Sequence, residues 1–175
     1  MNELLKIMES RRSVRKYTGE KVSEQHLYQI LQAGLLSPSG RGIRPWKFIA
    51  IKDKATLEEL ANARIGAADM LKNADCAIVV IADPDKTDVW IEDCSIAMAY
   101  MHLMADSLGL GSCWIQGRLR DSKEGNTSDE YVKRLLGYPK NFTLEAILSI
   151  GIPFEKRSPY PLPDIAEPKV HFEKY

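Results

Sequence analysis

The chain has few of the features that mark secreted, membrane-spanning or metal-binding proteins. Its three cysteines are an odd, widely spaced set without a Cys-x-x-Cys pair, which argues against a disulfide framework or a thiolate metal site. The longest uninterrupted apolar run, from Cys76 to Ala82, is far shorter than the roughly 20 residues of a membrane span. The N-terminus lacks the basic and then apolar pattern of a signal peptide. We therefore expect a cytoplasmic protein that uses neither membrane nor metal.

An excess of charge of one sign is also lacking. Lysine and arginine together number 24, as do aspartate and glutamate, so the formal net charge is zero. This balance gives no overall attraction to nucleic acid, and any anion site must be local. The 175 residues, 45% of them hydrophobic, are enough to bury the core of one domain without a disulfide or a metal.

Local signatures of common catalytic sites are absent as well. The sequence has no P-loop, no Gly-x-Ser-x-Gly motif and no His-Glu-x-x-His motif, and its three histidines lie far apart. His102 falls within an apolar helical pattern, where a hydrogen-bonded core histidine is the simpler interpretation. An enzyme without a local nucleophile, base or metal site would take its chemistry from an organic cofactor.

The hydrophobic pattern predicts helices and strands in irregular alternation. Helices are expected over residues 1–11, after the caps Ser23 and Asp53, and over 88–108 and 128–136, and strands over 46–51, 76–82, 112–116 and 142–152. The second helix should bury a stripe that includes Gly34 and Leu35. The run 76–82 has no polar residue, as in a strand covered on both faces, and should lie at the sheet centre. The pattern favours a layered α/β/α sandwich.

The last 23 residues differ from the rest of the chain. Five of the nine prolines lie there, which favours an extended arm, residues 153–175, attached to a domain of residues 1–152. The arm ends in Val170-His171-Phe172-Glu173-Lys174-Tyr175. We expect these apolar and aromatic groups to be buried against another surface, such as a second subunit.

A basic segment, Arg11 to Lys16, holds four cations and a serine where the first helix should end. Arginine presents forked donors that match phosphate oxygens, so the segment is suited to clamp a phosphate. The alternative is that the cations only offset the helix dipole. Because that dipole disfavours an anion, a phosphate site here would depend on the guanidinium charges.

Two glycine-containing segments are also compatible with a flat ligand, but their patterns are less specific than that of the basic segment. In the loop from Ser37 to Trp46, Gly40 and Gly42 allow close backbone approach, although a plain connection from helix to strand would explain the loop too. In residues 109–117 the glycines follow a helix and precede a strand, which is the reverse of the dinucleotide-binding order. A helix cap and a buried strand explain the first part of that segment but leave Gln116-Gly117 unexplained.

Taken in order, these segments resemble the flavin-dependent nitroreductase family over nearly the whole chain. The matching pieces are Arg11-Arg12-Ser13-Val14-Arg15, Ser37-Pro38-Ser39 with Pro45-Trp46-Lys47-Phe48, Gly109-Leu110-Gly111-Ser112-Cys113-Trp114-Ile115-Gln116-Gly117, and Ile150-Gly151-Ile152-Pro153. The resemblance implies an α/β/α sandwich with a mixed, largely antiparallel sheet. It also implies a homodimer with one FMN at each of two sites, arms that embrace the partner subunit, and NADH or NADPH as electron donor.

The resemblance assigns residues to the cofactor site by position. They are Arg11, Arg12, Ser13, Arg15, Pro38, Ser39, Gly40, Gly42, Arg44, Gln116, Gly117 and Arg157. Residues 11–13 would contact the phosphate and ribityl chain, and Arg15 the pyrimidine edge of the ring. The loop residues 38–44 would come from the other subunit. Gln116-Gly117 would lie against the reactive N5 edge, with the Gly117 backbone N–H as a donor; no side chain is catalytic, because the flavin carries the chemistry.

A basic residue of the arm would complete the phosphate site: Arg157 or Lys156, with Lys169 as a further alternative. The chain departs from the family pattern in having Gly42 and Arg44 where asparagine and glutamine are common, so one amide contact to the flavin is missing. Between the third helix and residue 75 no flavin contact is assigned.

Three functions fit these observations. The first is an NAD(P)H-dependent FMN oxidoreductase that works by a ping-pong mechanism on nitroaromatic, quinone or related acceptors. The second is an FMN-binding or interaction protein without nicotinamide-dependent turnover. The third, an anion-binding regulatory domain without flavin, leaves Trp46 and Gln116-Gly117 unexplained.

Overall fold

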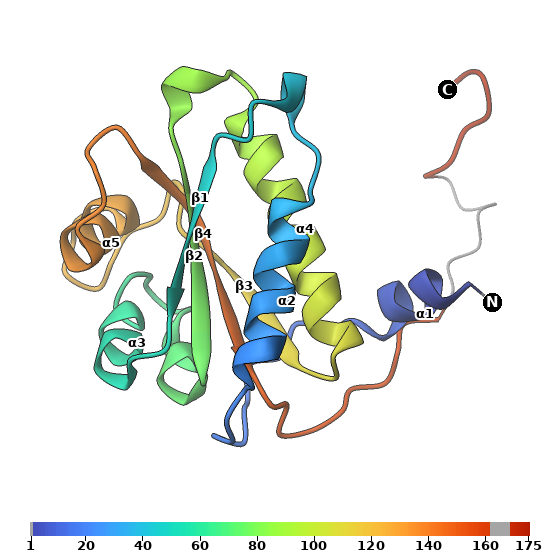
Figure 1. Cartoon of the computed structure of the whole chain (residues 1–175), viewed down its shortest axis with the longest axis horizontal. Helices are drawn as coiled ribbons and strands as arrows, with labels where there is room; N and C mark the ends of the chain where they lie inside the picture. The colour runs from blue at the N-terminus through green and yellow to red at the C-terminus, as the bar shows by residue number, and fades with distance from the viewer. Residues whose placement is uncertain (1, 162–168) are drawn as a thin grey trace.

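The structure, a computed structural model, describes residues 2–161 and 169–175. A four-stranded sheet runs through the body of the molecule with helices on both faces (Figure 1). The strands are β1 (Trp46–Ile51), β2 (Cys76–Ala82), β3 (Gly111–Gln116) and β4 (Thr143–Gly151). The helices are α1 (Glu3–Ser10), α2 (Glu24–Leu35), α3 (Lys54–Leu60), α4 (Trp90–Ser107) and α5 (Ser128–Leu136), with short 3-10 turns η1 (Gly40–Gly42), η2 (Asp69–Asn73) and η3 (Pro84–Lys86). The predicted α/β/α sandwich is confirmed.

The sheet has the strand order β1-β2-β4-β3, and all three pairings are antiparallel. β2 is buried along its whole length, which confirms its prediction as a central strand. Between β2 and β4 the register shifts, because Val80 pairs with Ala146 but Ile81 pairs with Leu144. Glu145 is therefore the extra residue of a β-bulge, a device that redirects side chains and backbone groups next to it.

Two hydrophobic clusters fill the space between the sheet and its helices. Helices α2 and α4 cover one face, and α3 and α5 cover the other (Figure 1). Alternation along β4 serves both clusters: Leu148 and Ile150 pack with α2 and α4, and Ile147 packs with α3 and α5. The three cysteines are buried and free, as expected. Within the described ranges, no helix has both the length and the apolar character that a membrane crossing requires.

The predicted helix caps are present. The side chain of Ser23 accepts from the His26 N–H at 3.1 Å, and that of Asp53 accepts from the Thr56 N–H at 2.8 Å. Leu35, by contrast, is 55% exposed, so its prediction as a buried residue is wrong. Gly34 makes the close contact at this turn: a Cβ added there would lie 3.0 Å from the ring of Phe48, and the next side chain along the helix points away.

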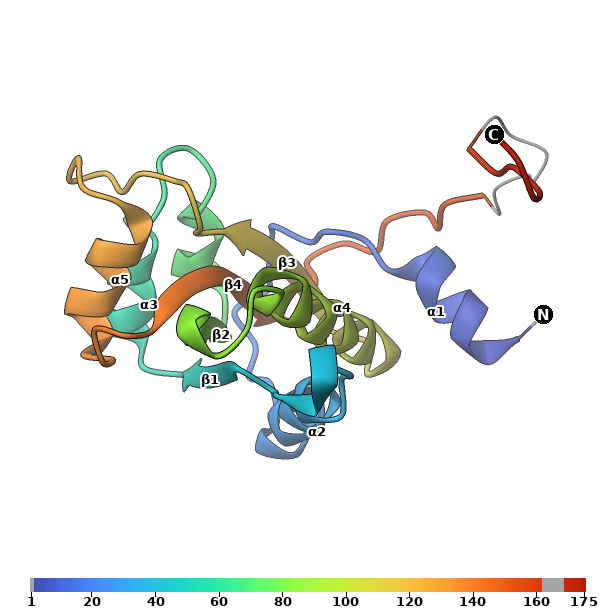
Figure 2. The same ribbon diagram turned by 90° about the horizontal axis from the view of Figure 1, so that it is seen from above.

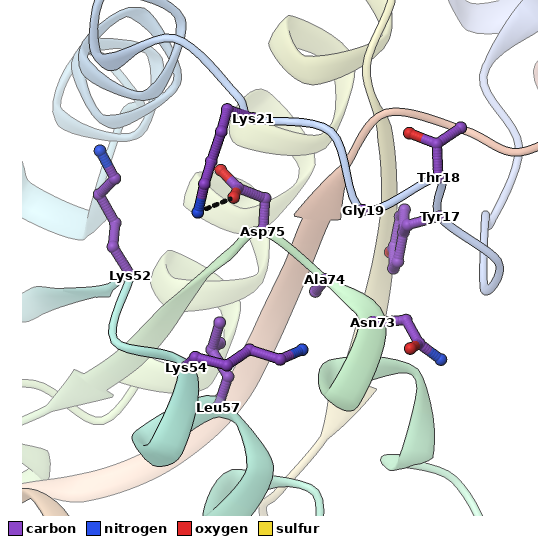
Figure 3. A pocket seen from close by; sticks show the side chains of 10 residues that line it. All are labelled: Tyr17, Thr18, Gly19, Lys21, Lys52, Lys54, Leu57, Asn73, Ala74 and Asp75. Atoms are coloured by element: carbon purple, nitrogen blue, oxygen red, sulfur yellow. Dashed lines mark ion pairs between the residues drawn. The ribbon is translucent and has the colours of Figure 1, made fainter.

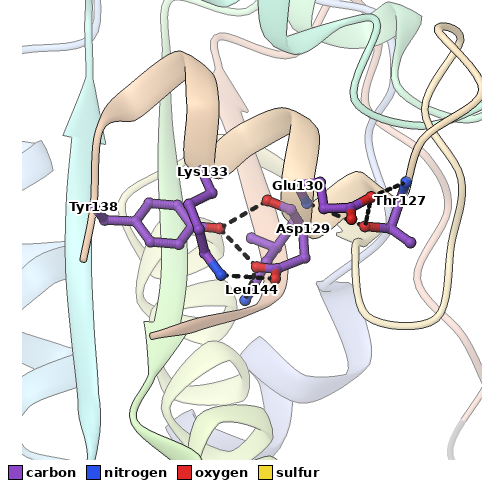
Figure 4. A network of polar contacts seen from close by, with 6 residues as sticks. All are labelled: Thr127, Asp129, Glu130, Lys133, Tyr138 and Leu144. Atoms are coloured by element: carbon purple, nitrogen blue, oxygen red, sulfur yellow. Dashed lines mark hydrogen bonds and ion pairs between the residues drawn. The ribbon is translucent and has the colours of Figure 1, made fainter. Parts of the chain in front are cut away.

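Helix α5 is fastened to the start of β4 by a polar network (Figure 4). Thr127 and Glu130 form a reciprocal capping box at its first turn. The Asp129 carboxylate accepts from the Leu144 N–H at 2.8 Å and from the Tyr138 hydroxyl at 2.9 Å. These bonds fix the main chain immediately before the Glu145 bulge.

Helix α1 and the arm project from one end of the sandwich (Figure 2). None of the residues of α1 is buried. The first part of the arm runs beside residues 11–16 and then beside this helix, since Phe154 N–H donates to the Lys16 carbonyl and Tyr160 N–H to the Glu9 carbonyl, both at 3.0 Å. Near the chain end, Phe172 is 80% exposed, so its expected burial against a second subunit stays a prediction.

Candidate active site

The basic segment lies along the outer edge of β3. Val14 N–H donates to the Ser112 carbonyl at 2.9 Å, and Ser13 forms a parallel bridge with the same residue. Gly111 permits this approach, because a Cβ there would lie 2.7 Å from a methyl carbon of Val14. Arg15 follows as an exposed residue. The segment is thus held at a fixed position on the sheet edge rather than hanging free.

Arg11 is the C-cap of α1, and its side chain turns toward α4. Its Nη1 lies 3.0 Å from Nε2 of His102, and the other ring nitrogen of His102 is hydrogen-bonded to the Ser112 hydroxyl. Burial, with a smaller effect from the Arg11 charge, lowers the pKa of His102 to about 4. The interpretation of His102 as a hydrogen-bonded core histidine is confirmed, and its link to Arg11 is a contact that the sequence pattern did not indicate.

Arg12 contacts the arm. Its Nη1 donates to the Ser158 carbonyl at 2.5 Å, and its guanidinium lies 3.9 Å from the centre of the Tyr160 ring. The two neighbouring arginines therefore point to different elements, Arg11 to α4 and Arg12 to the arm.

A cavity of about 370 Å³ lies between the end of α1, the end of α4 and the arm. Arg12, Lys156 and Arg157 contribute cations to its lining, and Asp106 and Glu155 contribute carboxylates. Of the arm residues considered for a phosphate site, Arg157 and Lys156 thus lie beside the basic segment. Lys169, the third candidate, does not line this cavity.

The loop before β1 is anchored to the first turn of α4. Gly40 N–H donates to Oδ1 of Asp93 at 2.7 Å, and the Ser39 hydroxyl accepts from the Arg44 N–H at 2.9 Å. Asp93 is only 2% exposed, and its Oδ2 has no hydrogen-bond partner in the part of the chain that the structure describes. Pro38, Gly42 and Arg44 are exposed. The sequence pattern did not single out Asp93, because acidic residues are common in the first turn of a helix.

The structure does not bring this loop to the basic segment of the same chain. The loop is bound at Asp93, whereas Arg11 is bound at His102 and its neighbour Ser10 at Asp106, with a hydroxyl-to-carboxylate distance of 2.6 Å. At 1.5 Å per helical residue, these attachment points on α4 are separated by roughly 14 to 20 Å. Within one chain, the loop and the basic segment are therefore held at separate positions along α4.

Gln116 and Gly117 lie at the far end of β3. The Gln116 amide oxygen accepts from the Trp114 indole at 2.9 Å. The Gly117 N–H, expected to face a flavin, instead donates to the Glu145 carbonyl at 3.1 Å, and the Arg118 N–H shares that acceptor at 2.9 Å. The physical reason is strand pairing: Gln116 pairs with Ala146, so the next residue, Gly117, falls opposite Glu145 and continues the β3–β4 ladder.

The side chain of Glu145 is a further buried acid beside this turn. It is 3% exposed, and its Oε2 lies 3.4 Å from Nε of Arg118. Burial raises the pKa of Glu145, and Arg118 and Gln116 partly offset that rise. Glu145 is the one charged residue of β4, a sequence signal that the motif assignments did not use.

A second cavity, of about 190 Å³, lies away from these residues at the ends of β1 and η2 (Figure 3). Lys21, Lys52 and Lys54 surround it, and Asp75 is buried in its wall. Asp75 already accepts from the Val22 N–H at 2.9 Å and pairs with Lys21 at 3.2 Å. Its contacts are internal, so this carboxylate stabilises the fold locally.

Comparison with known proteins agrees with the fold and the arrangement of the segments. A family model described as "Nitroreductase family" matches residues 8–68 and 63–152. A putative NADH dehydrogenase/NAD(P)H nitroreductase of Archaeoglobus fulgidus is 34% identical over 180 residues, which cover 100% of both chains. An FMN-dependent nitroreductase from Clostridium difficile superposes with a TM-score of 0.93 at 44% identity, covering 98% of this chain and 99% of that one. An NADPH:FMN oxidoreductase from Vibrio harveyi, complexed with NAD⁺, superposes with a TM-score of 0.83 at 26% identity, covering 99% and 78%.

These matches extend over essentially the whole chain. The chain belongs to the nitroreductase family. The resemblance inferred from the motifs is confirmed.

Proposed function

We propose that the protein is an NAD(P)H-dependent FMN oxidoreductase. The observation that carries this proposal is the basic segment, which is bound to the edge of β3 next to a cavity lined by Arg157 and Lys156. The names of its relatives, an FMN-dependent nitroreductase and an NADPH:FMN oxidoreductase, support the same function. Domain 1–152 would hold the cofactor, and arm 153–175 would complete the site.

The residues present fit a flavin mononucleotide. Guanidinium and ammonium groups of Arg12, Lys156 and Arg157 line one cavity beside the basic segment, as a single terminal phosphate requires. Arg11, Ser13 and Arg157 would hold the phosphate and the adjoining chain, and Arg12 would keep the arm in place through Tyr160. When bound, FMN supplies hydride transfer at N5, between a nicotinamide donor and an acceptor.

The chain's own groups would position the ring and stabilise charge. Arg15 would place a cation at the pyrimidine edge, where negative charge grows on reduction. The Gln116-Gly117 turn, held by the Glu145 carbonyl and the Trp114 indole, would form a rigid wall at the N5 edge. Donor and acceptor would use the same open face in turn, in a ping-pong sequence, with nitroaromatics or quinones as acceptors.

The site would be shared between two subunits of a homodimer. The roughly 14 to 20 Å between the attachment points on α4 supports this, because residues 38–44 and the basic segment of one chain are held apart. An apolar groove of about 310 Å³ beside α1, lined by Leu4, Met8 and Tyr100 among others, gives a further surface that a partner would cover.

The purified protein should therefore be yellow, with one non-covalent FMN per chain, and NADH or NADPH should bleach it under anaerobic conditions. Absorbance spectra before and after denaturation measure the flavin content, and stopped-flow absorbance measures the reduction rate. A protein that stays colourless after incubation with FMN would contradict the proposal. A protein that binds FMN but is reduced by neither nicotinamide would instead be an FMN-binding protein.

Substitutions of Arg11 and Arg15 should impair different properties of the protein, FMN affinity in the first case and flavin midpoint potential in the second. Arg11→Ala removes a phosphate partner, so FMN binding should weaken by roughly 1.5–3 kcal/mol and excess FMN should restore turnover. Arg15→Ala removes a cation from the ring, so the midpoint potential should fall by a few tens of millivolts, on the scale of roughly 30 mV per 1.4 kcal/mol. Flavin titration and potentiometry measure both variants. An unchanged potential in Arg15→Ala would show that Arg15 is assigned wrongly.

A further inference from the structure

We infer that His102 is a positioning residue for the phosphate of the flavin: its ring, fixed by Ser112, orients the guanidinium of Arg11 toward the anion. The inference rests on the proposed FMN-binding function. It concerns a residue on α4 that lies outside the basic segment and that the motif assignments leave out.

The contacts fix one state of the imidazole ring. Arginine carries only donors, so Nε2 of His102, 3.0 Å from Nη1 of Arg11, must present its lone pair. The proton of the neutral ring therefore lies on Nδ1, which donates to the Ser112 hydroxyl. A chain of two hydrogen bonds thus connects the end of α1, the C-terminal half of α4 and the start of β3.

The charge state of His102 suits this role. The burial and the neighbouring Arg11 that lower the pKa of His102 to about 4 keep the ring neutral near pH 7. A neutral acceptor holds the guanidinium without neutralising it, so the full positive charge remains for a phosphate. The carboxylate of Asp106, one helical turn further along α4, accepts a hydrogen bond from the Ser10 hydroxyl at 2.6 Å.

Arg11 needs such a support because its own helix gives it little. No residue of α1 is buried, and an arginine side chain has many rotamers in the absence of a partner. A side chain that is oriented before binding loses less conformational entropy when the ligand arrives. His102 engages one edge of the fork and leaves the remaining N–H groups for phosphate oxygens.

The test compares FMN with riboflavin, which has the same ring but no phosphate. In His102→Leu, the FMN dissociation constant should rise about tenfold, while that of riboflavin should change less than about twofold. His102→Gln should keep most of the FMN affinity, because a glutamine amide offers both an acceptor for Arg11 and a donor for Ser112. Fluorescence quenching measures the dissociation constants of both flavins for the unmutated protein and for each variant.

Ser112→Ala provides a second route if the leucine variant does not fold. It leaves His102 in place but removes the group that fixes its ring, so the preference for FMN over riboflavin should again fall, by about threefold. Equal losses for both flavins, or an unchanged FMN-to-riboflavin ratio in folded His102→Leu and Ser112→Ala, would overturn the role of His102. If the unmutated protein binds neither flavin, the proposed function itself is wrong, and the two failures are thereby distinguished.

Discussion

Truncation after Pro153 is expected to yield a folded monomer that no longer retains FMN. The two hydrophobic clusters lie within residues 22–152, so the sandwich itself should survive. The truncation removes Lys156 and Arg157 from the cavity and takes away the Ser158 carbonyl and the Tyr160 ring that hold Arg12. Loss of several charge-assisted contacts, each on the order of 1.5–3 kcal/mol, should reduce FMN affinity by at least two orders of magnitude.

Sedimentation measures the oligomeric state of the truncated chain, circular dichroism its folding, and absorbance its flavin content. The full-length double variant Lys156→Ala/Arg157→Ala is the matched control. It keeps the arm and should remain dimeric while losing FMN affinity, which separates the phosphate contacts from dimer formation. A folded, truncated chain that stays dimeric and holds FMN with near-native affinity would show that the arm has neither role.

Gly117→Ala should destabilise the fold by about 3 kcal/mol, a large effect for one added methyl group. A Cβ at this position would lie 2.7 Å from Cγ of Leu144, which is fully buried, and 3.4 Å from the Glu145 carbonyl oxygen. Leu144 cannot withdraw easily, because its N–H is bonded to Asp129 at 2.8 Å. The added methyl group should therefore push the Gln116-Gly117 turn outward.

Urea unfolding of this variant should be compared with that of Gly19→Ala. Gly19 has φ of +84° and nothing near its missing Cβ, so that substitution tests backbone strain alone and should cost about 1–2 kcal/mol. At Gly117 the substitution tests steric crowding instead. The double variant Gly117→Ala/Leu144→Ala should therefore lose less unfolding free energy than the sum of the losses in the two single variants. Additive costs in the double variant would mean that the Leu144 contact does not explain the glycine.

Much of the fold was predictable because its determinants are local. The apolar run of β2, the caps Ser23 and Asp53 and the broad apolar stripe of α4 each act within a few residues, and all were found where expected. The exposed Leu35 marks the limit of such reasoning. A periodic pattern identifies a buried face, but the approach of other elements, such as Phe48 at Gly34, decides where that face ends.

The candidate site was predictable as segments but not as contacts. The motifs identify residues 11–15 and 116–117 and, through the family resemblance, a flavin. They do not indicate that Arg11 contacts α4 whereas Arg12 contacts the arm. Nor do they indicate that Asp93 accepts a hydrogen bond from Gly40, or that the Gly117 N–H donates within the protein. The partners in these contacts lie far apart in the sequence.

The sequence by itself determined the order of helices and strands, the α/β/α class and the location of the basic segment, because propensity, periodicity and capping depend on near neighbours. Only the tertiary structure decided what each cation contacts and where each loop is held. The pairing of Arg11 with His102 spans 91 positions, and the bulge at Glu145 arises from the pairing of β4 with β2. Such contacts depend on how whole elements pack against one another, and the residues that flank either partner in the sequence do not specify them.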